Sequence, residues 1–292
     1  MKKIRCSYCG AEFEVPETVS VAVCPYCGST IWVQSGEIFK EHYIYDLRIE
    51  YNKAYNNAIG IAQRQFAAPE DLAMSATPSE GILHFVPLYL YQVKIRAECP
   101  ENPHAGIEER WKTVLAMSTP IKGLTPEYRF PTRGRRFFEP RILKRGKYHQ
   151  PDRDPRELLE LVVSSSRIRA MREAYNECDN PTLHDESKWL GIIHYPFWQI
   201  GYTYQGKEYY GLVDASDGTV VYLEYPIGSK RRQILVGGAI GLVLAGALLG
   251  AGVGSLLGAA KLGLEGGVLA SLGGVFNMLR MGTARIGRYR LK

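Results

Sequence analysis

The sequence contains none of the short motifs that commonly mark a catalytic centre. Its 292 residues include no Gly-Lys-Ser/Thr phosphate loop, no His-Glu-x-x-His pair and no Gly-x-Ser-x-Gly turn. These absences give no support to a P-loop nucleotide hydrolase, a zinc peptidase or a hydrolase built around a nucleophile elbow. We therefore expect that the protein is not an enzyme. An enzyme that uses Asp214 or His194 is the least favoured alternative.

Cysteine is scarce as well. The chain has six cysteines, whereas a secreted disulfide scaffold is shorter and denser in cysteine. No apolar signal segment separates Met1 from the first cysteine pair, so we expect reduced thiols and a cytosolic N-terminus. Cys99 and Cys178 stand alone, and we expect them to be buried free thiols. A second metal site that adds His104 and His184 is the less favoured interpretation.

The other four cysteines form two Cys-x2-Cys pairs separated by fourteen residues. Each such turn places two sulfurs on one side of a tight loop, and the following glycine (Gly10 or Gly28) allows the backbone conformation that the turn needs. Two facing turns supply four thiolates in a tetrahedron, which is the closed geometry of a structural zinc site. The candidate ligands are Cys6, Cys9, Cys24 and Cys27.

This spacing resembles that of the zinc-ribbon family. The resemblance covers residues 1–36 and implies a bound Zn²⁺ that stabilises the fold, and such ribbons also dock protein or nucleic-acid partners. The two turns also resemble those of the iron-binding rubredoxins, which have a longer stretch between them, so iron is the less favoured metal. The layout of the whole chain is similar to prokaryotic, especially archaeal, membrane-anchored proteins with an N-terminal zinc ribbon.

The middle of the chain carries signals for an α+β fold. We expect one or two helices within residues 37–66 and a strand over 82–97, broken at Pro87, because that stretch is rich in β-branched and aromatic residues. Residues 111–117 are a second strand candidate. Residues 189–225 alternate in polarity around two turn sequences, which predicts a three-stranded meander.

A helix start is also marked in the sequence. Asp154 can cap a helix, Pro155 suits its first position, and Glu157 completes a capping-box pattern.

Residues 189–226 resemble the sheet portion of PepSY-type domains, which implies a small α+β module associated with protein binding and protease inhibition.

Two segments of the chain are similar to each other. Phe85-Val86-Pro87-Leu88-Tyr89 resembles His194-Tyr195-Pro196-Phe197-Trp198, and each follows a predicted helix. We interpret this similarity as two related helix-plus-sheet units, with a chance likeness between two strands as the open alternative. The predicted organisation is a zinc ribbon (1–36), two α+β units (37–153 and 154–228), a transmembrane helical hairpin (233–281) and a basic tail (282–292).

Residues 234–260 carry no charge over 27 positions, which is long enough to cross a hydrocarbon core of about 30 Å with some tilt. A glycine recurs every fourth residue and forms one helix face, a glycine zipper that allows another helix to approach closely. These candidate membrane-packing residues, at which a homo-oligomer could also form, are Gly246, Gly250, Gly254 and Gly258. A second apolar stretch, 262–281, either completes a hairpin or lies at the membrane interface.

Basic residues precede the first apolar stretch and follow the second. Positive flanks stay on the cytoplasmic side, so we expect a cell-membrane protein whose soluble domains and both termini are cytoplasmic. The stretch 129–147 holds eight basic residues against one acid and is expected to be an irregular excursion. Its side chains either contact anionic membrane lipid or are simply solvated. The candidate contacts are Arg133, Arg135, Arg136, Lys144 and Arg145.

A nucleic-acid interpretation ranks third for the same stretch. Its arginines and lysines would contact phosphates, and Phe130, Phe137 and Phe138 would stack on bases. We therefore expect a non-enzymatic, membrane-anchored adaptor or scaffold that binds zinc and recruits a protein partner. The alternative is a membrane-tethered nucleic-acid-binding protein that uses the ribbon and residues 129–147.

Overall fold

The computed structural model describes residues 1–17, 19–283 and 286–291. It is a mixed α/β structure made mostly of sheet, and its chain divides into two compact units. Unit 1 comprises Met1–Tyr51, Gly81–Gln199 and Leu212–Thr219, and unit 2 comprises Asn52–Glu80, Ile200–Gly211 and Val220–Lys292. The strands β13 (Lys188–Tyr204) and β14 (Lys207–Asp214) contribute residues to both units. The domain boundaries expected from the sequence remain a prediction.

The N-terminal segment folds as two small sheets. Strands β1 (Lys2–Arg5) and β2 (Glu12–Val15) form an antiparallel hairpin, and β3 (Val21–Val23), β4 (Thr30–Trp32) and β5 (Ile38–Phe39) form a three-stranded antiparallel sheet. Alternate residues of β2 are buried, as expected for a strand with one covered face. The two cysteine turns lie in the β1–β2 and β3–β4 connections, which places them on neighbouring hairpins.

Two long strands lie at the centre of unit 1. Strand β8 (Ile82–Cys99) turns back into β9 (Asn102–Leu115), and β13 runs antiparallel to the other side of β8. The expected break at Pro87 does not occur: β8 continues through this residue. Proline cannot donate a backbone hydrogen bond, but the Pro87 carbonyl accepts one from the Ala116 amide at 2.9 Å.

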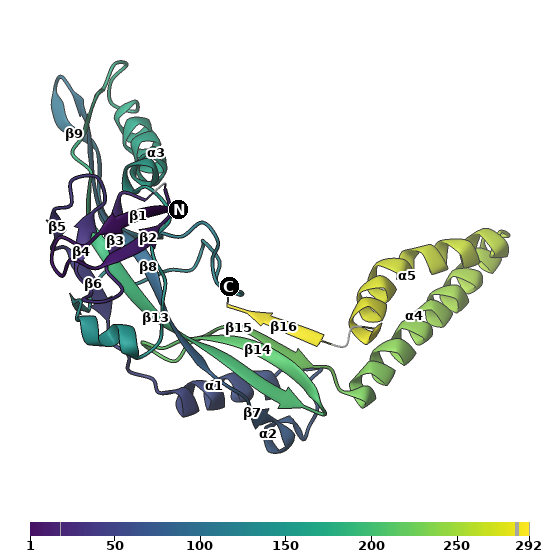
Figure 1. Ribbon diagram of the computed structural model, residues 1–292. Coiled ribbons are helices and arrows are strands. Elements are labelled where there is room, and N and C mark those ends of the chain that lie inside the picture. The colour runs from purple at the N-terminus through teal and green to yellow at the C-terminus, as the bar shows by residue number, and fades with distance from the viewer. Residues whose placement is uncertain (18, 284–285, 292) are drawn as a thin grey trace. The chain divides into compact units, whose positions relative to one another are not determined.

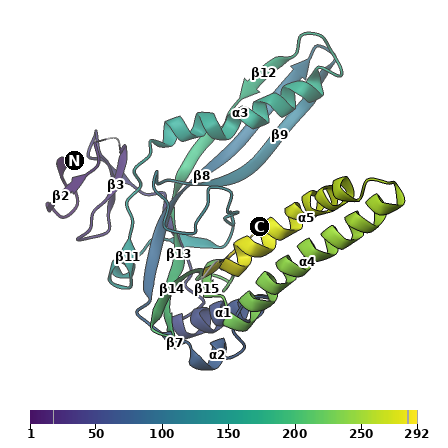
Figure 2. The ribbon, with the colours of Figure 1, turned by 90° about the vertical axis from the view of Figure 1, so that its right-hand side faces the viewer.

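Helix α3 (Pro155–Ala174) covers this sheet, as Figures 1 and 2 show. Its expected start is confirmed, because the Asp154 side chain accepts a hydrogen bond from the Arg156 amide at 2.7 Å and Pro155 opens the first turn. The helix approaches β9 closely, since a Cβ atom on Gly106 would lie 2.0 Å from the Ala170 carbonyl oxygen. After α3 the chain forms β12 (Thr182–Asp185), which pairs antiparallel with β8.

The region expected to be helical over 37–66 is helical only in part. Strand β6 (His42–Tyr45) pairs parallel with β13, because its aromatic and β-branched residues favour an extended backbone over a helix. Helix α1 (Tyr51–Gln63) begins later, and α2 (Leu72–Ser75) and β7 (Thr77–Pro78) follow it in unit 2.

Within 129–147 the chain is more regular than expected. It forms β10 (Arg135–Phe137), which pairs antiparallel with β6, the 3-10 helix η1 (Pro140–Lys144), and β11 (Lys147–Tyr148), which pairs parallel with β8. Within the described part of the chain, β10 ends the sheet, since its one strand partner is β6. Its other edge therefore has backbone groups that no strand pairs.

The expected meander is present as β13, β14 and β15 (Val220–Pro226), which are neighbours in the sheet. Helices α4 (Ser229–Leu256) and α5 (Ala260–Thr283) then pack against each other in unit 2, side by side in both ribbon views (Figures 1 and 2). Strand β16 (Ile286–Arg290) returns antiparallel to β15, so most of the described tail is a strand. Of this tail, residues 284, 285 and 292 lie outside the described residues.

Among the described residues, one helical segment is long and apolar enough to cross a membrane. It covers Val236–Leu256 with a mean hydropathy of 2.1, and 6% of its most apolar window is buried within the protein. This is consistent with membrane association. A second membrane-spanning segment and the orientation of the chain remain predictions.

Candidate metal centre and surrounding sites

The two cysteine turns have the same backbone geometry. In each turn the glycine amide donates to the carbonyl of the first cysteine, Gly10 to Cys6 and Gly28 to Cys24, both at 2.9 Å. Both glycines have a φ of +75°, a conformation that side-chain-bearing residues rarely adopt. This explains why a glycine follows the second cysteine of each pair.

The turns bring the four sulfurs together. The Sγ atoms all lie within 4.8 Å of one another, and the Cys6–Cys27 and Cys9–Cys24 Sγ pairs are each 3.7 Å apart. A tetrahedron with metal–sulfur bonds of about 2.3 Å has edges of roughly 3.8 Å. The four residues expected to bind metal therefore form a cluster that could hold a metal ion, and its dimensions suit zinc.

The electrostatic setting of the thiols is uneven. Burial raises the pKa of the Cys24 thiol to about 12. Burial also opposes ionisation of Cys27, but hydrogen bonds from the Ser29 side chain and backbone outweigh it and lower the Cys27 pKa to about 7. A divalent cation would remove this asymmetry, because bound thiolates are deprotonated outright. Four sulfur donors leave no open coordination position, so the expected contribution of the ion is folding free energy.

The ribbon contacts the rest of unit 1 through polar groups and aromatic rings. The Ser20 hydroxyl donates to the Asp154 carboxylate, and the Gln150 side chain donates to the Val23 carbonyl at 2.6 Å and accepts from the Val23 amide at 3.1 Å. Trp32 and Phe39 both contact the Trp189 ring, and Phe39 stacks on it at 4.7 Å between centroids. The ribbon is therefore packed against the sheet and the start of α3.

A chain of buried histidines runs beneath the ribbon. The Thr30 hydroxyl lies 2.7 Å from His42 Nδ1, His42 Nε2 lies 2.8 Å from His194 Nδ1, and His194 Nε2 lies 3.0 Å from the His149 carbonyl oxygen. Because that carbonyl can only accept, His194 Nε2 donates. One neutral tautomer of His42 and one of His194 then give every ring nitrogen of these two residues a hydrogen-bond partner. Burial lowers the pKa of His194 to about 3 and that of His149 to about 4.

His149 joins a second pair, since its Nε2 lies 2.8 Å from His84 Nδ1, and His84 Nε2 lies 3.1 Å from Gln199 Oε1. From the sequence alone, His84 and His194 would each be expected to pack locally. Their shared position shortly before a strand proline is the one sequence signal that links them.

A hollow of about 250 Å³ opens beside the metal centre. Its wall includes Cys27, and its apolar members come from the ribbon and from the segment around β10: Tyr8, Ile38, Phe39, Phe137 and Phe138. Tyr8 and Phe137 are 69% and 70% exposed, and Ile38 is 49% exposed. Tyr26, at the tip of the second cysteine turn, is exposed to the same degree as Tyr8.

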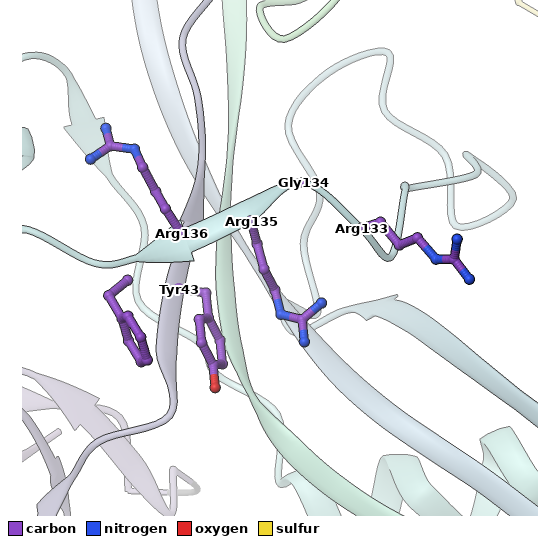
Figure 3. Close-up of a pocket in the computed structure, with 6 residues that line it drawn as sticks. Tyr43, Arg133, Gly134, Arg135 and Arg136 are labelled. Carbon is purple, nitrogen blue, oxygen red and sulfur yellow. The ribbon is translucent and has the colours of Figure 1, made fainter.

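The five basic residues expected to contact an anionic surface occupy different settings. Arg135 lies over the Tyr43 and Trp111 rings, at 5.0 and 5.2 Å from the centroids, and Figure 3 shows its side chain beside Tyr43. Arg136 leaves the other side of β10 (Figure 3) and pairs with Asp46 at 2.5 Å and with Glu139 at 2.8 Å. Arg135 is thus partly covered, whereas Arg136 is paired with carboxylates but is itself exposed.

The remaining three are exposed. Arg145 lies 3.7 Å from Glu50, and Lys144 ends η1. Arg133 lines a hollow of about 340 Å³ together with Tyr43, Arg135, Arg136 and Phe137 (Figure 3). Contact of these residues with lipid remains a prediction.

Three of the four expected packing glycines face α5. A Cβ atom on Gly246 would lie 2.6 Å from the Gly267 carbonyl oxygen, and one on Gly250 would lie 2.1 Å from that of Gly263. A Cβ atom on Gly263 would lie 2.7 Å from the Gly254 Cα atom. Gly258 has a φ of +71° and lies beyond the last residue of α4, with no atom within 4 Å of its Cβ position.

The structure joins Cys99 and Cys178 in a disulfide with a Cα–Cα distance of 6.0 Å. This corrects the expectation that both are free thiols, and it separates them from a second metal site. The bond links the end of β8 to the segment after α3. Disulfides are uncommon in the cytosol, so this pair weighs against the argument that took every thiol as reduced.

Comparison with protein-family models, with curated proteins and with solved structures gives no match. The fold and the site themselves define an α/β protein with an N-terminal four-cysteine cluster suited to a metal ion. The same chain carries one helix able to cross a membrane.

Proposed function

We propose that this chain is a membrane-anchored adaptor whose zinc-loaded ribbon helps to form a docking surface for a protein partner, without catalysis of its own. The observation that carries the proposal is the exposed aromatic surface around the hollow beside Cys27. Large exposed apolar side chains that gather around a hollow mark interaction sites, and aromatic residues supply much of the binding free energy in such places.

The chemistry of this surface favours an acidic, extended segment with one apolar side chain. The hollow beside Cys27 offers apolar walls from Ile38, Phe39 and Phe137. The arginine-lined hollow of Figure 3 shares Phe137 with it and would meet acidic side chains. Strand β10 carries Phe137 and ends the described sheet, so an extended segment can pair with its backbone.

The alternative, a membrane-tethered nucleic-acid-binding protein, has less support. Of the three phenylalanines that were expected to stack on bases, Phe130 is buried among Tyr128, Tyr195 and Phe197. Phe138 stacks on His42 at 3.9 Å, which leaves Phe137 as the exposed one. A base-stacking surface normally needs successive exposed rings beside unpaired cations.

Two features support a helical hairpin as the anchor. Pro226 at the end of β15 lies opposite Ile286 at the start of β16, so the chain between them leaves and returns at one place. If α4 crosses a membrane, α5 must bring the chain back to the same side. The basic residues of both flanks favour the cytoplasmic side for that place.

The docking proposal is tested with a peptide. The full-length protein in detergent is titrated with a fluorescent peptide of alternating acidic residues around one central Phe, and with a second peptide in which lysines replace the acids. We expect saturable binding of the acidic peptide alone. Phe137→Ala should weaken it about tenfold or more, because a buried aromatic anchor contributes at least about 1.4 kcal/mol.

Tyr175→Ala serves as the matched control, since Tyr175 is an exposed aromatic residue (57%) after α3. Removal of zinc by a chelator should also abolish peptide binding. Equal binding of the two peptides, or equal loss in Phe137→Ala and Tyr175→Ala, would contradict the proposal.

The anchor is tested separately by thiol labelling of sealed membranes. Single substitutions Ser229→Cys, at the first residue of α4, and Ala259→Cys, between the helices, are exposed to a membrane-impermeant reagent, and peptide mapping reports each site by itself. We expect the two positions to label from opposite sides. Labelling of both from one side would contradict the hairpin and favour a helix pair that lies on the surface.

A further inference from the structure

A second cleft in unit 1 is lined by arginines and lies over a buried carboxylate. Its volume is about 400 Å³. Three arginines line it, Arg48 from the β6–α1 connection and Arg129 and Arg133 from the segment before β10. We call this site the arginine cleft, defined by these three residues with Tyr128, Asp214 and Ser216.

The carboxylates of the cleft already have donors. Asp214 is 1% exposed and its Oδ2 accepts from the Tyr128 and Tyr195 hydroxyls at 2.6 and 2.8 Å. Its Oδ1 accepts from the amide and hydroxyl of Ser216 at 2.8 and 2.7 Å. Asp46 pairs with Arg136, and Asp217 accepts from the Thr219 amide at 2.8 Å. None of these carboxylates is bound to an arginine that defines the cleft.

The carboxylates of the cleft have hydrogen-bond or ion-pair partners in the described part of the chain, whereas the side chains of its three arginines have none there. Among the residues that the structure describes, no side-chain hydrogen bond or ion pair involves Arg48, Arg129 or Arg133. All three are exposed, whereas Arg136, close to Arg133 in the chain, has two carboxylate partners. Burial also raises the pKa of the Asp214 carboxyl, against the hydrogen bonds from Tyr128 and Ser216. The cleft is therefore lined by three arginines and three aspartates, and no ion pair joins any of these arginines to any of these aspartates.

We propose that the arginine cleft binds a small phosphate monoester. Each guanidinium offers paired donors in a fixed fork, and three forks suit a dianionic group whose oxygens can be shared among them. A volume of about 400 Å³ lies within the usual range for small-ligand pockets. The walls from Tyr45 and Phe130 would contact the carbon part of the ester.

The phosphate can come from two sources, a soluble metabolite or the headgroup of an anionic lipid. The cleft shares Arg133 with the arginine-lined hollow of Figure 3, but the two residues substituted in the test below, Arg48 and Arg129, line neither of the hollows near β10. Failure of the peptide test would therefore leave this inference standing, and the reverse also holds.

The test is calorimetric titration of the full-length protein, in a detergent without phosphate groups, with glycerol 3-phosphate. We expect saturable binding to one site, and no binding of glycerol. Arg48→Gln and Arg129→Gln should each weaken binding about tenfold or more, because charge-assisted hydrogen bonds are lost. Arg129→Lys should restore part of the loss, since it keeps the charge and loses the fork.

Lys144→Gln is the matched control. It removes one exposed positive charge from the same basic stretch, at a residue outside the cleft, and should change the affinity less than about twofold because distant surface charges are screened. Absence of saturable binding by a protein that circular dichroism shows to be folded would overturn the proposal. So would an equal loss of affinity in Lys144→Gln and Arg129→Gln.

The source of the phosphate is decided by competition. The titration is repeated in nanodiscs of phosphatidylcholine and in nanodiscs that also contain phosphatidate. A tenfold weaker apparent affinity for glycerol 3-phosphate in the phosphatidate discs, absent in Arg129→Gln, assigns the site to a lipid headgroup. Equal affinity in both kinds of disc assigns it to a soluble ester.

Discussion

Val86 of β8 lies directly opposite Tyr195 of β13 in the central sheet of unit 1. The two residues hold the same place in the similar segments 85–89 and 194–198, each immediately before a proline. Around them Phe85 faces Pro196 and Pro87 faces His194. Two similar antiparallel segments that pair about the same position are related by a local two-fold axis. The two segments that resemble each other in sequence are therefore paired with each other in adjacent strands.

The first prediction concerns the metal centre. Cys24→Ser removes a buried ligand, and three sulfurs are too few for a closed structural site. We expect the zinc content, measured by atomic absorption, to fall from about one ion per chain to near zero, and the N-terminal hairpins to become sensitive to protease. The control is Tyr26→Ala, in the same turn but with an exposed side chain. Unchanged zinc content in Cys24→Ser would contradict the ligand assignment.

The second prediction concerns the disulfide between Cys99 and Cys178, which closes a sequence separation of 79 residues. Chain entropy alone gives such a cross-link up to about 4 kcal/mol of stabilisation. In urea denaturation, the free energy of unfolding of the double variant Cys99→Ser/Cys178→Ser should be lower than that of the unchanged protein by an amount of this order. Both proteins are measured under the same zinc-saturated conditions.

Alkylation before and after reduction provides the direct check. In the native protein, peptide mapping should find Cys99 and Cys178 modified only after a reductant has been added. Equal modification without reductant would show that the thiols are free, and would restore the argument for a fully reduced chain.

Local sequence signals predicted the parts of this structure that depend on neighbouring residues. The helix start at Asp154 and Pro155 and the turn glycines Gly10 and Gly28 are set by backbone geometry within a few residues, and the structure has them where they were expected. The cysteine spacing also predicted the cluster, because each pair is joined by a short turn.

Contacts between distant residues could not be read from the sequence. The number of charges in 129–147 does not predict that Arg136 pairs with Asp46, which is 90 positions away. Cys99 and Cys178 are separated by 79 positions, and His42 and His194 by 152. These pairs depend on how strands far apart in the chain are ordered in the sheet, and neither periodicity nor composition specifies that order.

The third prediction concerns pH. The pKa of His194 in the folded protein is about 3 and that of His149 about 4, both below the ordinary value near 6.5. Between pH 6.5 and 4 the unfolded chain therefore binds protons that the folded chain does not. Stability is fully present above pH 6.5 and falls as the pH decreases, by up to about 1.4 kcal/mol per pH unit for each histidine.

Substitution of His194 tests this assignment. We expect His194→Gln to lower the stability at pH 7.5, because the partners of a buried polar side chain are left without hydrogen bonds. The variant should also reduce the slope of stability against pH by about the contribution of one histidine. His104→Gln, at an exposed residue, should leave the dependence unchanged. Parallel curves for His194→Gln and the unchanged protein would show that His194 already protonates in the folded state.

The fourth prediction concerns the contact between α4 and α5. A Cβ atom on Gly250 would lie 2.1 Å from the Gly263 carbonyl oxygen, whereas one on Gly252 would meet nothing within 4 Å. Gly250→Leu should therefore force the helices apart and cost about 1–3 kcal/mol, as overpacking usually does. Gly252→Leu adds the same side chain on an open face and should leave the helix pair intact.

Double electron–electron resonance between spin labels on the two helices measures the separation directly. With labels at Leu248→Cys and Leu269→Cys, both exposed positions, the distance should increase in Gly250→Leu and stay the same in Gly252→Leu. If Gly252→Leu disturbed the distance as much, the apolar surface of α4 that faces away from α5 would be occupied as well. A second copy of the chain would then be its natural occupant, since small residues on a membrane helix also favour self-association.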